Sequence, residues 1–273
     1  MICTPKVRHF WRCIARSTFY YYLKTQNKDK YENEKQEISN IYNANKGRYV
    51  YRRVMTVLRN KGYLINHKTV LKLMNELGLK GKQHKNDKYH SYKGEVRKIA
   101  DNLLKRDFYA SKPFEKLTTD VTQFKVGDEK VYLSPVMDLF NREIVSYSIS
   151  KSPNLWQVRE MLDGLFCKLP ADATPIFHSD QGWQYQHAEY QRLLAEHNIT
   201  QSMSRKGNCM DNGAMENFFG RLKVEMFYGE KFENVDSFID ELERYIHYYN
   251  NDRISLKLKG MSPVQYRTHL LTI

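Results

Sequence analysis

The sequence predicts an α/β fold, namely a mixed five-stranded sheet with flanking helices, preceded by a helical region. Strand-like patterns come first, in residues 116–125, 131–137 and 143–149. Helical and strand-like segments then alternate to residue 203, and apolar stripes of helical period fill most of the remaining chain. Successive strands followed by alternating helices and strands are typical of a mixed sheet with helices on its faces.

Each expected strand has its own marker in the sequence. Residues 116–125 are rich in Thr, Val and Phe, and Gly127 and Asp128 supply a turn before the next strand. Pro135 lies inside that next strand, which predicts either an edge position or a bulge. The remaining elements are expected as a helix over residues 154–167, a strand over 175–178, a helix over 187–196 and a strand over 199–203.

The C-terminal part predicts strongly amphipathic helices. Two apolar stripes of helical period lie there: Met215, Phe218, Phe219, Leu222 and Met226, then Val235, Phe238, Ile239, Leu242, Tyr245, Ile246 and Tyr249. Ser262 and Pro263 begin a final short helix, with proline at its first position. We therefore assign residues 113–273 to one α/β domain with C-terminal helices.

The N-terminal part predicts helices of a different kind. Residues 1–45 form a helical region, and residues 46–81 read as two helices, the second capped by Asn66. The polar face of this pair offers basic side chains, including Arg52, Arg53, Lys68 and Lys72. We interpret the pair as a helix-turn-helix-like DNA-binding module, with a plain helical hairpin that has a solvated basic face as the alternative.

The positive charge is concentrated in the first part of the chain. Residues 1–112 hold 26 Lys+Arg against 9 Asp+Glu, whereas residues 113–273 hold 18 against 22. Such asymmetry is expected when one part binds a polyanion and the other has a different task. Residues 82–112 are basic and aperiodic, and we interpret them as a linker along phosphates, or as an ordinary solvated connector. Nucleic acid is the favoured partner.

Membranes, export and zinc are not expected. The chain has no apolar run of membrane-spanning length and no signal-peptide pattern, and its basic segments lack an apolar underside. The four cysteines, Cys3, Cys13, Cys167 and Cys209, do not have zinc-knuckle spacing. We therefore expect a cytoplasmic protein that has reduced thiols and no zinc.

Three carboxylates stand where the predicted fold would bring them together. Asp120 lies in the middle of the first strand, where strand propensity disfavours it, and Asp180 follows the fourth strand. Glu216 comes after 35 intervening residues, one turn into a helix that starts near Asp211. Singly, each has an ordinary structural explanation: a hydrogen-bonded Asp, a turn Asp and a solvent-facing helix Glu. Asp138 is a rival ligand, although the residues after it favour a turn-shaping role.

The helix that carries Glu216 also carries a candidate phosphate-binding cation. Glu216 is about 100° from Met215 on a helix, so it can face the sheet edge while Met215 packs. Lys223 lies seven residues further, two turns along the same face. Phosphoryl transfer needs charge neutralisation and an activated oxygen, which two divalent metals held by carboxylates supply. We expect Mg²⁺, with Mn²⁺ as a substitute.

Several motifs together carry a family resemblance. They are Thr119-Asp120-Val121-Thr122, residues 132–138, His178-Ser179-Asp180-Gln181-Gly182, residues 202–208, Asp211-Asn212 with Glu216, and Met261-Ser262-Pro263. The run from residue 116 to 263 resembles the catalytic core of bacterial insertion-sequence transposases with two reading frames, which is similar to the retroviral integrase core. Residues 46–81 resemble the helix-turn-helix segment before that core. The resemblance covers at least four-fifths of the chain, and the predicted element order is the ribonuclease-H-like one.

This resemblance implies roles for named residues. Asp120, Asp180 and Glu216 would be the DDE metal ligands, and Lys223 the basic residue two turns past the glutamate. We expect DNA contacts from Arg52, Arg53, Lys68, Lys72, Arg205 and Lys206. Departures from the family pattern are Leu117 in place of Trp, Val50 in place of Gly and Met210 in place of Tyr.

The expected function is therefore that of a DDE transposase. It would cleave insertion-sequence ends and join the freed 3′ hydroxyl to target DNA, as a homo-oligomer on DNA. Fusion to, or help from, an upstream-frame DNA-binding protein is also expected from the resemblance. The resemblance further implies a bacterial cytoplasmic protein that is associated with the nucleoid when it binds DNA. The alternatives are a ribonuclease-H-like nuclease that does not join strands, and a catalytically inactive DNA-binding regulator.

Overall fold

The computed structural model describes residues 15–25, 29–82, 99–205 and 208–271. The chain forms two compact units, Met1–Gly81 and Lys82–Ile273. No helix in these described ranges is both long and apolar enough to cross a membrane.

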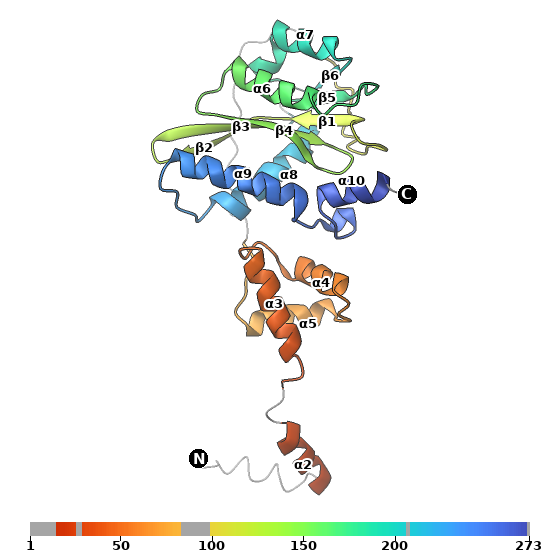
Figure 1. The fold of residues 1–273 in the computed structure, drawn as a ribbon, viewed down its shortest axis with the longest axis vertical. Helices are drawn as coiled ribbons and strands as arrows, with labels where there is room; N and C mark the ends of the chain where they lie inside the picture. Colours follow the sequence, from red (N-terminus) through yellow and green to blue (C-terminus); the bar gives the residue numbers. More distant parts are fainter. Residues whose placement is uncertain (1–14, 26–28, 83–98, 206–207, 272–273) are drawn as a thin grey trace. The chain divides into compact units, whose positions relative to one another are not determined.

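The first unit is built from packed helices. Helix α2 (Arg16–Thr25) is followed by α3 (Glu32–Ala44), α4 (Tyr51–Asn60) and α5 (His67–Glu76), and the last three pack on one another (Figure 1). Asn66 caps α5 as expected, because its side chain accepts a hydrogen bond from the Lys68 amide. Their shared core is apolar: Ile38, Ile41, Val54, Leu58, Val70, Leu73 and Met74. The expected helix pair is therefore packed against a third helix, α3.

The second unit contains a mixed sheet. Its strands are β1 (Lys116–Thr119), β2 (Thr122–Val126), β3 (Glu129–Asp138), β4 (Ile144–Ser150), β5 (Ile176–Ser179) and β6 (Thr200–Met203). Strand β3 pairs antiparallel with β4 on one side and with both β1 and β2 on the other. The remaining pairings, β1 with β5 and β5 with β6, are parallel. The C-terminal ends of β1 and β5 therefore meet at the same edge.

The first expected strand is interrupted at Asp120. Sequence pattern predicted one strand over residues 116–125, but the structure divides it into β1 and β2. Both pair with β3 in one continuous register, which puts Asp120 opposite Pro135. Proline has no amide hydrogen to donate to the ladder. Strand β3 is central and its pairing with β4 shifts register beside Pro135, at Val136/Met137, so the bulge alternative is confirmed and the edge alternative is wrong.

Helices cover both faces of the sheet (Figure 1). Helices α6 (Leu155–Phe166) and α7 (Ala188–Glu196) lie on one face, and α8 (Gly213–Leu222) and α9 (Val235–Asn251) on the other. Alternate residues of β3 enter the two cores: Leu133 and Met137 pack with α8 and α9, whereas Val136 packs with α6 and α7. The chain ends in α10 (Pro263–Leu271), beside α9.

Short irregular helices connect these elements. Within the described residues, three of them are 3₁₀ turns: η1 (Trp183–Gln186), η2 (Cys209–Asn212) and η4 (Leu256–Leu258). The fourth, η3 (Lys223–Phe227), is a π-helix that continues directly from α8. Short π-helical turns are rare and are often found at functional sites.

Candidate active site

Asp120 lies in the break between β1 and β2. Its side chain is half-buried, and Oδ1 accepts a hydrogen bond of 2.7 Å from the Val121 amide. Because the strand ladder is interrupted at this residue, the carboxylate is held by its neighbour's backbone. The break therefore accommodates a residue that strands disfavour.

Asp180 follows β5, the parallel neighbour of β1. Its Oδ1 accepts a hydrogen bond of 2.9 Å from the Gly182 amide. A β-carbon on residue 182 would lie 2.9 Å from that same oxygen and 2.5 Å from Gln184 Nε2. Glycine at this position thus leaves room for the Asp180 carboxylate to sit against the turn.

The two aspartates act on each other electrostatically. Burial raises the pKa of Asp120 well above its ordinary value, and the negative charges of Asp180 and, more weakly, Glu216 add to this rise. The Val121 amide and the Lys223 ammonium oppose it. Burial also raises the pKa of Asp180, against the effect of the Gly182 amide. The structure thus brings the sequence-predicted residues Asp120, Asp180, Glu216 and Lys223 into one electrostatic neighbourhood.

Glu216 lies on α8, and Lys223 is the first residue of η3, the π-helix that continues directly from it. Glu216 is exposed in the first turns of α8, while its neighbour Met215 is fully buried in the core. Lys223 opens η3, and its ammonium lies 5.7 Å from the centroid of the Phe124 ring on β2. The cation is therefore held beside the strand that begins just after Asp120.

Asn212 connects the two parts of this site. Its Oδ1 accepts a hydrogen bond of 2.6 Å from the Thr118 hydroxyl, and its Nδ2 donates one of 3.1 Å to the Thr119 carbonyl. Both partners lie on β1, immediately before Asp120, whereas Asn212 immediately precedes α8. The sequence pattern alone indicates no role for Asn212, although the Asp211-Asn212 pair directly before the glutamate helix belongs to the family motifs.

Asp211 anchors the loop before the same helix. Its buried carboxylate accepts hydrogen bonds from the side chains of Arg205, Arg106 and Asn102 at 2.7 to 2.9 Å. These contacts, with Arg205 first, hold the pKa of Asp211 far below its usual range. Arg205, which is expected to contact DNA, has a 56% exposed side chain and pairs with Asp211 at 2.9 Å, so its contact with DNA stays a prediction. Lys206, the other loop residue expected to contact DNA, lies outside the described residues.

The rival carboxylate Asp138 has a different setting. It is fully buried, and its two oxygens accept hydrogen bonds of 2.9 Å from the amides of Phe114 and Phe140. Burial raises its pKa to about 6, while both amides lower it. These contacts agree with the expected turn-shaping role.

The site offers oxygen donors for a cation, from carboxylates at a sheet edge. Among the residues that the structure describes, no three His, Cys, Asp or Glu side chains are close enough to form a complete metal site as they stand. The donors still fit a hard divalent cation, because that class of ion prefers carboxylate oxygens and retains several waters. Burial disfavours the ionised form of both aspartates and raises their pKa, so a bound cation would stabilise their ionised carboxylates.

The basic residues of the helical unit differ in their surroundings. Arg52, Lys68 and Lys72 are exposed, and the Lys72 ammonium lies 3.8 Å from a carboxylate oxygen of Glu76. Arg53 is half-buried, with its guanidinium 5.4 Å from the centroid of the Tyr49 ring. Arg52 also lies over an aromatic ring, 5.7 Å from the Tyr51 centroid, but it is exposed like Lys68 and Lys72 and so is accessible to a ligand. Arg53 differs from these three because its side chain is half-buried.

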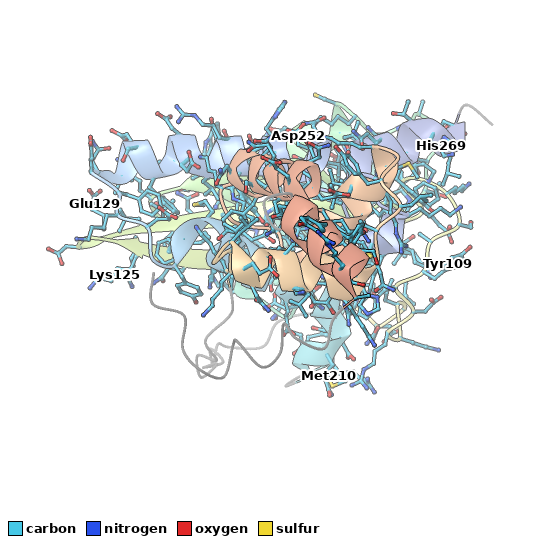
Figure 2. All side chains as sticks on the ribbon, turned by 90° about the horizontal axis from the view of Figure 1, so that it is seen from below. Tyr109, Lys125, Glu129, Met210, Asp252 and His269 are labelled. Atoms are coloured by element: carbon cyan, nitrogen blue, oxygen red, sulfur yellow. The ribbon has the colours of Figure 1, made fainter. Side chains whose placement is uncertain are left out.

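The residues that depart from the family pattern occupy contrasting places. Leu117 is fully buried and packs in the core under α6 and α7. Met210 is 62% exposed and projects from the ribbon in Figure 2. Val50 is the residue before α4 and is partly exposed. None of the three departures replaces Asp120, Asp180 or Glu216.

Family models match most of the chain. Two models described as integrase core domain match residues 110–209 and 216–271, and one described as HTH-like domain matches residues 28–86. The InsK transposase of insertion sequence element IS150 from Escherichia coli (strain K12) is 54% identical over 255 residues, which cover 93% of this chain and 90% of the relative. The chain belongs to the insertion-sequence transposase family.

Other relatives agree with this assignment. A transposase-like protein of Haemophilus influenzae is 55% identical over 217 residues, which cover 80% of this chain and all of the relative. The InsF transposase of insertion sequence IS3A from Escherichia coli is 34% identical over 82% of this chain and 78% of its own length. The simian T-cell lymphotropic virus intasome structure matches with a TM-score of 0.50 and 17% identity, over 77% of this chain and 69% of that one. This last similarity supports an integrase-like fold for this transposase.

Proposed function

We propose that this transposase uses Asp120, Asp180 and Glu216 to hold divalent cations, with Mg²⁺ as the expected ion and Mn²⁺ as a substitute. The observation that carries the proposal is the placement of Asp120 and Asp180 at the ends of two adjacent parallel strands, with Glu216 and Lys223 acting on the same carboxylate. Its substrate would be the DNA at the ends of its insertion sequence, and afterwards target DNA.

The chemistry required is cleavage of a phosphodiester and attack of the freed 3′ hydroxyl on another phosphodiester. Bound divalent cations would supply charge neutralisation at the phosphate and an activated oxygen nucleophile. The chain's own residues would do the positioning. Asn212 holds the glutamate helix against β1, Gly182 orients Asp180, and Lys223 would bind a phosphate oxygen as a point charge.

The exposed cations of the first unit would bind the DNA backbone. Arg52, Lys68 and Lys72 are accessible, and phosphate contacts position a protein on DNA without reading its sequence. Residues 46–81 as the DNA-binding module, 82–112 as the linker and 113–273 as the catalytic domain stay predictions. The homo-oligomer on DNA and the upstream-frame partner also stay predictions.

Three isosteric variants test the proposed metal ligands. Asp120→Asn, Asp180→Asn and Glu216→Gln preserve side-chain size but remove the charge that would hold a cation. We expect each to lose cleavage and strand joining by orders of magnitude while still binding DNA. Matched controls are Asp236→Asn and Glu129→Gln, because both parent side chains are exposed and lie on other segments.

The wild type must be assayed first, as the full frameshifted product, with Mg²⁺ and then with a chelator. Hydrolysis without joining would support the nuclease alternative, and no metal-dependent reaction on the element's own ends would support the regulator. Equal strand joining by wild type and by Glu216→Gln would refute the role of Glu216.

A further inference from the structure

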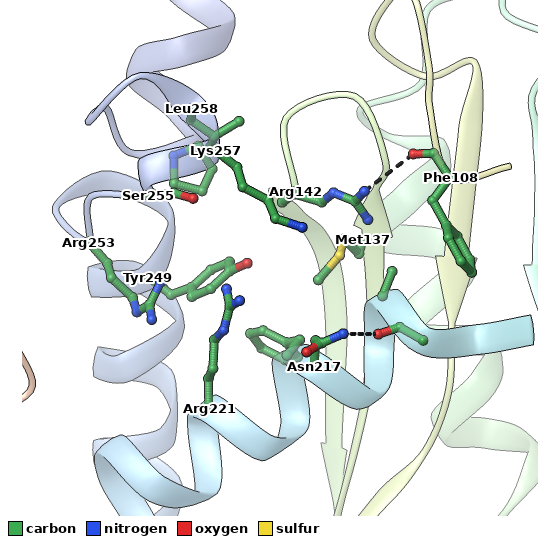
Figure 3. A pocket seen from close by; sticks show the side chains of 14 residues that line it. Phe108, Met137, Arg142, Asn217, Arg221, Tyr249, Arg253, Ser255, Lys257 and Leu258 are labelled. Carbon is green, nitrogen blue, oxygen red and sulfur yellow. Dashed lines mark hydrogen bonds between the residues drawn. The ribbon is translucent and has the colours of Figure 1, made fainter. Parts of the chain in front are cut away.

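The second unit has a basic cavity of about 220 Å³ that Asp120, Asp180 and Glu216 do not line. It lies between α8, the turn between β3 and β4, and the segment after α9 (Figure 3). Within the described part of the chain, no Asp or Glu lines it and four of its lining residues are basic: Arg142, Arg221, Arg253 and Lys257. A concave surface of one charge sign focuses potential toward an anion.

One of these four charges is already neutralised. Arg253 is buried and donates hydrogen bonds of 2.6 and 2.8 Å to the two carboxylate oxygens of Glu225. Tyr245 donates a further hydrogen bond to the same carboxylate. Arg253 therefore forms a buried structural ion pair with Glu225, and the other basic side chains that line the cavity are Arg142, Arg221 and Lys257.

Arg142 is fixed in place at the cavity wall. It adopts a left-handed backbone conformation, with φ of 65°, in the turn between β3 and β4. Its guanidinium donates a hydrogen bond of 3.3 Å to the Phe108 carbonyl, so its direction is set before a ligand arrives. The acidic group that acts on it, Asp138, is occupied by two backbone amides.

Arg142 and Arg221 point into the same space from different elements. Figure 3 shows the side chains of Arg142, Arg221 and Lys257 directed toward one cavity from the turn, from α8 and from η4. Burial lowers the pKa of Arg142, and the positive charge of Arg221 lowers it further. Like charges brought together in this way are stabilised when an anion lies between them.

The cavity is close to the proposed catalytic glutamate. Gly213, Asn217 and Arg221 are spaced by four residues along α8 and line the cavity, and Glu216 occupies the adjacent face of that helix. Arg221 is five residues from Glu216, which corresponds to about 7.5 Å along the helix axis. A DNA strand at Glu216 would therefore pass near the cavity.

We propose that this basic cavity binds a backbone phosphate of DNA, through Arg142, Arg221 and Lys257, and so fixes the course of the strand next to the reacting phosphodiester. The proposal rests on the proposed function, because the strand is taken to pass Glu216. A guanidinium presents its N–H donors in a planar fork that matches phosphate oxygens, and two of the three cations are arginines. Contacts of this kind position the strand and carry no sequence information.

The test removes two exposed charges and leaves Arg142 in place. The full-length double variant Arg221→Gln, Lys257→Gln is compared with wild type and with the control Arg159→Gln, Lys151→Gln, whose parent residues are exposed and do not line the cavity. Binding of a short DNA duplex is titrated across salt concentration in chelator. Each phosphate that is no longer neutralised should reduce the slope of log affinity against log salt by about 0.9.

For the cavity variant we expect weaker DNA binding and a less steep fall of log affinity with log salt. The control variant should show the same slope as wild type, and all three proteins should have the same melting temperature. Equal slopes and affinities in the cavity variant and wild type would overturn the proposal. Thermal stabilisation by inorganic phosphate that is absent in the cavity variant, with DNA binding unchanged, would assign the cavity to a small anion and also overturn it. Because chelator prevents metal-dependent chemistry, failure of the proposed catalytic function would not alter this result.

Discussion

Asn212 donates a hydrogen bond from Nδ2 to the Thr119 carbonyl over 3.1 Å, and so ties the start of the glutamate helix to the residue before Asp120. The same side chain accepts a hydrogen bond from Thr118, so both ends of its amide group are used. Asn212 and Thr118 are almost completely buried, and buried polar groups of this kind depend on their hydrogen-bond partners. The Asn212 amide group therefore helps to fix the position of Glu216 relative to Asp120.

Replacing Asn212 with alanine should impair the reaction more than the fold. Loss of two buried hydrogen bonds should lower the free energy of unfolding by about 1–3 kcal/mol. A displacement of the helix by even about 1 Å can reduce a reaction rate by about 100-fold, so strand joining should fall steeply. Denaturant unfolding and a strand-joining assay check this.

Asn251→Ala is the matched control, since its side chain donates a hydrogen bond to the His247 carbonyl within the same helix, α9. It should join strands at the wild-type rate. If Asn212→Ala were as active as this control, the link between α8 and β1 would have no catalytic importance.

The pH dependence of stability should report the burial of Asp138. Its pKa is raised to about 6 in the folded protein, so the folded state binds a proton more tightly than the unfolded chain does. Its contribution to stability is therefore present at acid pH and declines as pH rises from about 4 to about 6. In Asp138→Asn this decline should be absent.

Asp138→Asn should itself be less stable at pH 4, because an amide can accept from only one of the Phe114 and Phe140 amides with its single oxygen. The difference in unfolding free energy between variant and wild type should narrow toward pH 7. Chemical denaturation across this range measures it. A constant difference at every pH would show that Asp138 titrates at its ordinary pKa.

Lys223→Ala should weaken binding of the DNA end while the protein remains folded. The ammonium lies beside the Phe124 ring and acts electrostatically on Asp120, so its loss removes a point charge next to the proposed phosphate position. The expected effect is weaker affinity for the end, measured in chelator, with a similar melting temperature. Lys223→Arg retains the charge and should recover much of the binding. A large fall in melting temperature with end-binding preserved would make Lys223 a structural residue.

The exposed cations of the first unit should contribute to the salt dependence of DNA binding. Replacing Arg52, Lys68 and Lys72 together with glutamine in the full chain should lower the slope of log affinity against log salt by up to about 0.9 for each phosphate that is no longer neutralised. Arg53→Gln is the contrasting variant, because its guanidinium packs on the Tyr49 ring. It should lower stability more than the salt slope. An unchanged slope in the triple variant would favour the plain helical hairpin.

Local periodicity explains why much of the fold was predictable from the sequence. The strand pattern of β3 and β4, the apolar stripes of α8 and α9, and the cap at Asn66 all depend on residues close in the chain. Burial on one face imposes a period of two on strands and about 3.6 on helices, and caps use donors two or three residues away. These features are therefore visible without knowledge of tertiary contacts.

Two of the candidate acidic residues could also be recognised in the sequence. Aspartate is disfavoured inside a strand, where Asp120 was expected, and Asp180 directly follows a strand. The sequence could not show how they are held. Asp120 interrupts the strand opposite Pro135, and Arg205 pairs with Asp211 in the loop before the glutamate helix. Strand register and ion pairing depend on which segments become neighbours.

By itself, then, the sequence determined the α/β class, the basic and acidic halves, and the three carboxylates proposed as metal ligands. Only the tertiary structure decided that Asn212 would join α8 to β1 across 93 residues of chain, and that Arg142, Arg221 and Lys257 would line one cavity. The physical reason is the distance along the chain over which each kind of interaction acts. Periodicity and capping act over a few residues, whereas these contacts exist only after the sheet has brought distant segments together.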